Sequence, residues 1–98
     1  MNRKVINPPE LLSVNPTYSQ AIRANGFVFV AGQIGIDPAT GKLISSDIAE
    51  QARQAIENTA TILKAAGSCL ENVVSTTLYL TEFEQLAKVN TVYAEYFP

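Results

Sequence analysis

The sequence has no histidine, no tryptophan and a single cysteine, Cys69. Without histidine, and with only one thiol, the chain cannot build the common zinc sites or a Ser-His-Asp triad. A lone cysteine also excludes an internal disulfide and is typical of a reducing compartment. Any catalysis must therefore use carboxylates, tyrosine, amides, basic side chains or backbone groups, and we expect no metal.

Basic residues and long apolar runs are also scarce. Seven Lys and Arg against nine Asp and Glu give a net charge of −2 and a pI near 4.9. This charge disfavours a protein that mainly binds nucleic acid, since such proteins usually present a basic face. The longest apolar run, "FVFVA" at 27–31, is too short to span a bilayer, and no apolar signal-peptide core is found near Met1. We therefore expect a cytoplasmic protein.

What is present is enough for one small domain, residues 1–98, in which 47% of the side chains are hydrophobic. A chain of this length buries about 60–65% of its unfolded surface, so its core is modest. Association with further subunits would help to stabilise it.

Glycines mark the segment "AGQIGIDPATGK" at 31–42. They do not form a phosphate-binding P-loop, because five residues rather than four separate Gly35 from Gly41, and no hydroxyl residue follows Lys42. The "DPATG" sequence predicts a turn instead. Gly32 and Gly35 at the end of a strand have two interpretations: a β-bulge, or a close approach by a ligand or another backbone.

Local patterns predict the order hairpin, helix, strand, helix after a short strand at 3–6. Asn25-Gly26 between "SQAIRA" and "FVFVA" is the strongest hairpin signal, because both turn positions need positive φ. A capping-box pattern at Asp47 opens a helix that ends at Gly67. The β-branched run "NVVSTTLYL" at 72–80 predicts a second long strand.

A second capping-box pattern, Thr81 with Glu84, opens a final helix that runs to about Phe97. A strand, helix and strand in this order normally form a right-handed crossover between parallel strands. The fold class is therefore α+β, with two helices on one face of a mixed β-sheet. Apolar residues of "FVFVA" remain for the other face, and a partner subunit would cover them.

Two polar residues stand out from the predicted packing. Asn90 shares a helical stripe with apolar and aromatic side chains, and it is either a buried amide bonded to backbone or an amide that points into a cleft. Tyr18, before the hairpin, is either a packing residue or part of a site. Arg23 and Arg53 are interpreted as solvated charges rather than anion ligands.

Five segments resemble the RidA/YjgF family of imine deaminases: "NPTYSQAI", "FVFVAGQIGIDPATGKL", "QARQAIENTATILKAAG", "NVVSTTLYL" and "VNTVYAEYF". The resemblance implies a chorismate-mutase-like α+β fold, a homotrimer and ligand clefts between subunits. It implies hydrolysis of 2-iminobutanoate and 2-iminopropanoate to 2-oxo acids and ammonia, without a metal or an organic cofactor.

Four site residues carry over from the family motifs. Tyr18 and Asn90 are the implied catalytic residues, and Ala31 and Gly32 are the implied substrate-binding residues. Gly32 would then allow close backbone approach to a small carboxylate. Two positions depart from the pattern, since Ala31 replaces the family's serine and Thr17 replaces a glycine.

The family resemblance further implies a Pro-Ala-Arg motif and two strands after the second helix. That arginine would hold the substrate carboxylate, and a glutamate near the C-terminus would help to position water. Because the printed sequence stops at Pro98, we expect a truncated domain that lacks activity as printed. Two alternatives stay open: a non-catalytic trimer that binds small 2-oxo or amino acids, and, less favoured by the pI, an endoribonuclease that inhibits translation.

Overall fold

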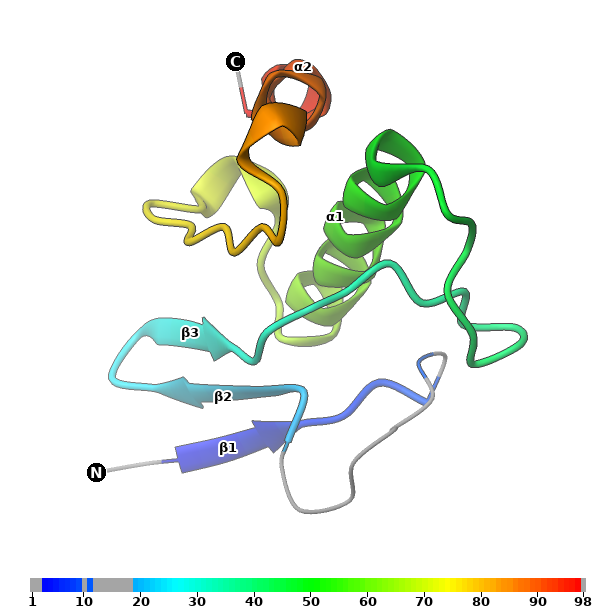
Figure 1. The fold of residues 1–98 in the computed structure, drawn as a ribbon. Helices are drawn as coiled ribbons and strands as arrows, with labels where there is room; N and C mark the ends of the chain where they lie inside the picture. Colours follow the sequence, from blue (N-terminus) through cyan, green and yellow to red (C-terminus); the bar gives the residue numbers. More distant parts are fainter. Residues whose placement is uncertain (1–2, 10, 12–18, 98) are drawn as a thin grey trace.

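The computed structural model describes residues 3–9, 11 and 19–97. Three antiparallel strands form one sheet in the order β1 (Arg3–Ile6), β2 (Ala21–Ala24) and β3 (Phe27–Val30). Two helices lie above this sheet (Figure 1). The α+β class is confirmed, but the sheet of the described residues is antiparallel, not mixed.

The predicted hairpin turn joins β2 to β3. Asn25 has φ 54° and Gly26 has φ 81°, which is the pair of left-handed conformations that a type I′ turn requires. The turn sets the register in which Ala24 faces Phe27 and Ala21 faces Val30.

Helix α1 (Ile48–Ala65) begins and ends where its sequence signals predict. The Asp47 carboxylate accepts a hydrogen bond from the Glu50 backbone N–H at 3.0 Å. At the other end Gly67 takes φ 81°, and its N–H donates to the Lys64 carbonyl at 3.0 Å. These contacts satisfy backbone groups that a helix terminus leaves unpaired.

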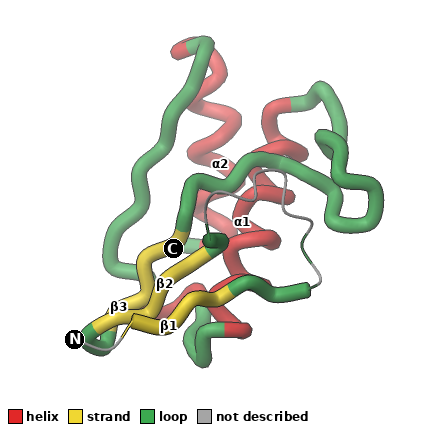
Figure 2. Tube along the Cα trace, turned by 90° about the horizontal axis from the view of Figure 1, so that it is seen from below, coloured by secondary structure: helices red, strands yellow, loops and turns green. Residues whose placement is uncertain are grey.

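The main hydrophobic core lies between the sheet and α1. Ile62 of α1 is fully buried, and it packs in one cluster with Ile6 of β1 and Ala21 of β2. The cluster also contains Ala66, and the half-buried residues against it are Leu11, Val28 and Val30. Figure 2, seen from below, has the strands in front and both helices behind them, so the helices share one side of the sheet.

The final helix differs in detail from its prediction. A 3₁₀ turn (Phe83–Gln85, η2) precedes α2 (Leu86–Tyr96), and no side chain caps either element. The predicted capping box is therefore not formed. Helix α2 contacts α1 and buries Val89 and Val92, so Asn90 lies outside the buried face. The prediction that Asn90 shares the buried stripe of this helix was wrong. It assumed that the larger side chains define the buried stripe, whereas two valines face α1.

The predicted strand at 72–80 is not formed in the described residues. Its first residue belongs to a 3₁₀ turn (Leu70–Asn72, η1), and the rest runs beside no partner strand. Val74 and Tyr79 are each 90% exposed. A β-branched sequence favours extended backbone, but a strand needs a hydrogen-bonding neighbour, so the predicted parallel crossover is absent.

The sheet face away from the helices is also apolar. Val5, Ile22 and Phe29 lie in register across the three strands. Phe29 is 64% exposed and Phe27 is 62% exposed. We call this surface, formed by Val5, Ile22, Phe27 and Phe29, the outer face. No helix in the described ranges is long and apolar enough to cross a membrane.

Candidate active site

The predicted substrate-binding residues lie directly after β3. The Ala31 N–H donates to the Gln20 carbonyl at 2.9 Å, which extends the β2–β3 pairing by one bond. Gly32 is exposed, and a Cβ added there would meet no atom within 4 Å. Among the described residues the Gly32 N–H has no hydrogen-bond acceptor. The Ala31–Gly32 peptide therefore offers a donor in open space.

Gly35 has a different role from Gly32. It is buried, and an added Cβ would lie 2.7 Å from both the Cα and the carbonyl oxygen of Gln51 in α1. Only glycine allows this approach of helix and loop. Of the two interpretations of the glycines, close backbone approach therefore applies at Gly35, and the neighbour is the chain's own helix.

Side-chain amides hold the start of this loop. The Gln33 Nε2 donates to the Ala31 carbonyl and to the Gln20 Oε1, both at 3.1 Å. The Gln20 backbone N–H donates to the Asn7 Oδ1 at 2.8 Å. Gln20 is only 6% exposed, so these bonds satisfy a buried polar group. We call Asn7, Gln20 and Gln33 the amide cluster.

The far end of the loop is tied to α1. The buried Asn58 donates from Nδ2 to the Ile36 carbonyl at 2.8 Å and accepts from Gln54 Nε2 at 2.9 Å. Gly41, with φ 74°, closes the predicted turn, and its N–H donates to the Asp37 carbonyl at 2.8 Å. The loop is therefore fixed at both ends.

The other two predicted site residues are not brought to this loop within the described chain. Asn90 lies on the exposed side of α2, and its side chain makes no hydrogen bond to any described residue. Tyr18 lies outside the described residues. A cleft between subunits would draw residues from two chains, so the assignment of Tyr18 and Asn90 stays a prediction.

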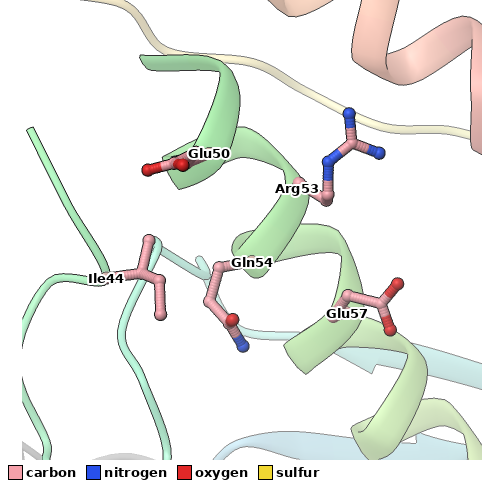
Figure 3. A pocket seen from close by; sticks show the side chains of 5 residues that line it. All are labelled: Ile44, Glu50, Arg53, Gln54 and Glu57. Atoms are coloured by element: carbon pink, nitrogen blue, oxygen red, sulfur yellow. The ribbon is translucent and has the colours of Figure 1, made fainter. Parts of the chain in front are cut away.

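A shallow pocket of about 330 Å³ lies along the exposed side of α1 (Figure 3). Its walls hold two carboxylates, an arginine, an amide and one apolar side chain: Ile44, Glu50, Arg53, Gln54 and Glu57. Of the predicted site residues that the structure describes, Ala31, Gly32 and Asn90, none lines it. The pocket is therefore a surface feature of α1 and the loop before it, separate from the Ala31–Gly32 peptide.

Charged contacts beside that pocket join the two helices. Arg53 forms an ion pair with Glu95, and the Tyr96 hydroxyl donates to the Glu57 carboxylate at 2.7 Å. The Arg53 guanidinium lowers the pKa of Glu95, and the hydrogen bond to Glu57 raises the pKa of Tyr96. Both partners of the ion pair are about half exposed, so the pair contributes little to stability.

Both arginines singled out in the sequence are exposed, as predicted, but each also has a partner within the protein. Arg53 is paired with Glu95, and the Arg23 Nη1 donates to the Ala66 carbonyl at the end of α1 at 3.0 Å. Helix C-termini favour cations because their last carbonyls lack intrahelical partners. Both guanidinium groups therefore already have protein partners.

The amide cluster was missed by reasoning from the sequence. Gln20 and Gln33 lie in two quoted motifs, "NPTYSQAI" and "FVFVAGQIGIDPATGKL", but neither residue was considered. The signal available was a glutamine beside each end of an apolar hairpin, where a buried amide needs a partner. Asn7 could not have been found, because its contact depends on the pairing of β1 with β2.

These features define the chain as a small α+β domain with two helices on one sheet face. After the third strand, the Ala31–Gly32 peptide is fixed by a hydrogen bond from Gln33. A family model described as Endoribonuclease L-PSP matches residues 10–98. The chain belongs to this family, which is also known as RidA/YjgF.

Named relatives support the same family. A RutC family protein of Pyrococcus horikoshii is 54% identical over 80 residues, which cover 82% of this chain and 64% of that protein. The human 2-iminobutanoate/2-iminopropanoate deaminase is 41% identical over 95 residues, covering 97% of this chain and 69% of that one. The chain thus spans 64% of the length of the first of these relatives.

Solved structures share the fold. YyfA, a Rid-family protein of Yersinia pestis, has a TM-score of 0.93 at 38% identity and covers 98% of this chain and 76% of its own. Escherichia coli TdcF with bound serine has a TM-score of 0.89 at 31% identity, covering 96% of this chain and 73% of its own.

Proposed function

We propose that this domain hydrolyses 2-imino acids, in particular 2-iminobutanoate and 2-iminopropanoate, to 2-oxo acids and ammonia. The observation that carries the proposal is the similarity to the human deaminase, at 41% identity over 97% of the chain. The exposed Gly32 peptide supports it, since an N–H with open space around it and no acceptor among the described residues suits a small anion.

The reaction needs no redox chemistry. Water adds through its oxygen to C2 of the protonated imine, and one water proton leaves to a nearby acceptor. The tetrahedral product then transfers a proton to nitrogen and expels ammonia as the C2–O double bond forms. Free imines already hydrolyse in water, so the required acceleration is small, and orientation and electrostatic stabilisation can supply much of it.

Each predicted residue has a role in this scheme. The Gly32 N–H donates to the substrate carboxylate, and the Ala31 methyl stands where the family resemblance implies a serine hydroxyl. Tyr18 and Asn90 form walls of the cleft and polarise the imine. Because Arg23 and Arg53 already have partners, the cation for the carboxylate is the arginine of the Pro-Ala-Arg segment implied by the family.

We further propose that the protein acts as a homotrimer with clefts between subunits. The outer face supports this assembly, because two phenylalanines there are more than half exposed. Contiguous apolar surface of this kind is typical of protein interfaces. A neighbouring subunit would also bring a second set of side chains to Gly32.

The test is a turnover assay on a form of the protein that includes the Pro-Ala-Arg segment, because the printed chain alone is expected to lack activity. A PLP-dependent threonine dehydratase generates 2-iminobutanoate in situ, and semicarbazide competes with water for the imine. We expect added protein to raise the yield of free 2-oxobutanoate in proportion to its concentration, and Gly32→Pro, which removes the N–H, to abolish the increase. An unchanged yield with folded wild-type protein would contradict the proposal.

A binding protein without turnover is the second candidate, favoured by the solved TdcF structure with bound serine. Calorimetric titration with serine and with 2-oxobutanoate distinguishes the two functions, because a binding protein would take up either ligand without forming product. The family model's name raises RNA cleavage as a third candidate. Its test is cleavage of a labelled RNA by protein of verified purity, and the net charge of −2 argues against it.

A further inference from the structure

In the amide cluster, contacts with backbone groups determine which side-chain atom is the amide nitrogen and which is the oxygen. The Ala31 carbonyl can only accept, so the Gln33 atom that faces it at 3.1 Å must be the amide nitrogen. The same nitrogen faces Gln20 at 3.1 Å, so Gln20 must present its oxygen. The Gln20 backbone N–H can only donate, so Asn7 also presents its oxygen. Each amide therefore has one orientation.

This polarity bears directly on Gly32. The carbonyl that Gln33 contacts belongs to the Ala31–Gly32 peptide, and the described residues contain no cis peptide bond. In a trans peptide the N–H points opposite to the C=O. A hydrogen bond from Gln33 to the carbonyl therefore sets the direction of the Gly32 N–H, which points away from the amide cluster.

The bond also acts on the strength of that donor. A hydrogen bond accepted by a peptide carbonyl polarises the peptide and makes its N–H a better donor. A second bond, from the Ala31 N–H to the Gln20 carbonyl at 2.9 Å, holds the preceding peptide. Gln20, at the centre of the cluster, is almost fully buried, so its bond to Gln33 is largely shielded from water.

We propose that Gln33 and Gln20 are positioning residues that aim and strengthen the Gly32 N–H as a carboxylate donor. The inference rests on the proposed function for the identity of the ligand, a small 2-imino or 2-oxo acid. It does not rest on it for the geometry, which concerns the Ala31–Gly32 peptide alone. Gln33 acts through the peptide and does not touch the substrate.

The informative variant is Gln33→Glu. At neutral pH its carboxylate would face two acceptors, the Ala31 carbonyl and the Gln20 Oε1, and no donor would remain between them. Protonation of the new carboxyl restores one O–H donor, so the original arrangement returns in part at low pH. Gln33→Met has similar length and removes the donor without any titration.

Gln54→Glu is the matched control. Gln54 also donates a side-chain hydrogen bond, to Asn58 at 2.9 Å, but it lies on α1 and is not bonded to any member of the amide cluster. The Gln54→Glu variant loses a comparable side-chain hydrogen bond and gains the same negative charge as Gln33→Glu. A general effect of charge or stability would appear in both glutamate variants.

The first measurement is the Gly32 amide resonance in two-dimensional ¹⁵N–¹H NMR from pH 4 to pH 8. We expect Gln33→Glu to shift this resonance at neutral pH and to return it towards the wild-type position as the carboxyl protonates. Gln33→Met shifts it at every pH, and Gln54→Glu leaves it unchanged. A Gly32 resonance that is identical in wild type and both Gln33 variants would overturn the proposal.

The second measurement is kcat/KM for the in situ imine, with all variants made in the form of the protein that includes the Pro-Ala-Arg segment. Leaving the peptide carbonyl and Gln20 without a donor should lower it by roughly 5- to 150-fold in Gln33→Glu at neutral pH. Part of the loss returns at lower pH, which a purely structural role would not produce. If wild type shows no turnover, the proposed function fails while the NMR result still decides the role of Gln33. If wild type is active and Gly32 does not respond, only this inference fails.

Discussion

The two faces of the sheet are built from the same strands but differ in what covers them. On the inner face, Ile6, Ala21 and Val30 lie in register and pack beneath α1. On the outer face, Val5, Ile22 and Phe29 lie in register with no cover from the described chain. Alternation along each strand thus yields two apolar surfaces, and the described part of the chain supplies a helix layer for only one.

The inner face also carries charge at one end, where the outer face carries aromatic rings. Lys4, Arg23 and Val28 share one row across the strands, and Arg23 reaches the end of α1. On the outer face, Phe27 and Phe29 form a tilted pair with ring centroids 6.3 Å apart. The contact between Arg23 and α1 is made within one chain. The Phe27–Phe29 pair leaves aromatic surface exposed that a neighbouring subunit could cover.

Breaking the inner face should have the largest effect. Ile62→Ala leaves a cavity in a site that is fully buried at 0% exposure, and we expect a loss of about 2–5 kcal/mol in the free energy of unfolding. The measurement is urea unfolding followed by circular dichroism. Ile44→Ala, at a 39% exposed site, is the control and should cost much less. Equal losses would show that the cluster beneath α1 is not the main core.

Breaking the outer face should change assembly rather than folding. Phe29→Asp places a charge on the outer face, and each Phe that a partner buries is worth about 1.5–3 kcal/mol. We expect the variant to stay folded but to be a monomer in multi-angle light scattering, whereas we expect wild type to be a trimer. Thr40→Asp adds the same charge in an exposed turn and should leave the trimer intact. A trimeric Phe29→Asp, or a monomeric wild type at micromolar concentration, would rule out the proposed interface.

Local signals in the sequence predicted the elements whose cause is local. The hairpin follows from Asn25-Gly26, and α1 follows from Asp47 at its start and Gly67 at its end. Each of these depends on conformational preferences of a few neighbouring residues. The excess of apolar strand surface was also predicted, since "FVFVA" is too apolar for a half-covered sheet.

Features that depend on distant partners were not predicted. The segment 73–80 has strand-like composition, but no neighbouring strand lies beside it in the described chain. The buried stripe of α2 was misplaced because Val89 and Val92 are selected by contact with α1, not by size. The candidate site was predicted at Ala31 and Gly32 through family motifs, yet the cluster that orients their peptide depends on strand pairing.

The smallest expected effect is a difference in unfolding free energy between substitutions at the two arginines of the sheet. Arg23, on the inner face of the sheet, donates to the Ala66 carbonyl at the end of α1. Arg3 lies opposite Ala24 in the β1–β2 register, on the same side of the sheet as the outer face. Arg23→Met keeps an apolar stem but removes the cation from the helix C-terminus, so we expect a loss of about 0.3–1 kcal/mol. Arg3→Met should fall within about 0.5 kcal/mol of wild type.

Varying the salt concentration tests whether the effect of Arg23 is electrostatic. An interaction between an exposed cation and a helix terminus weakens as ionic strength rises, because the screening length falls from about 10 Å at 0.1 M to about 3 Å at 1 M. Urea midpoints in 0.1 M and 1 M sodium chloride, at a protein concentration that fixes the oligomeric state, should therefore converge for wild type and Arg23→Met. Equal losses in Arg3→Met and Arg23→Met, unaffected by salt, would mean that the inner row stabilises α1 through packing alone and not through charge.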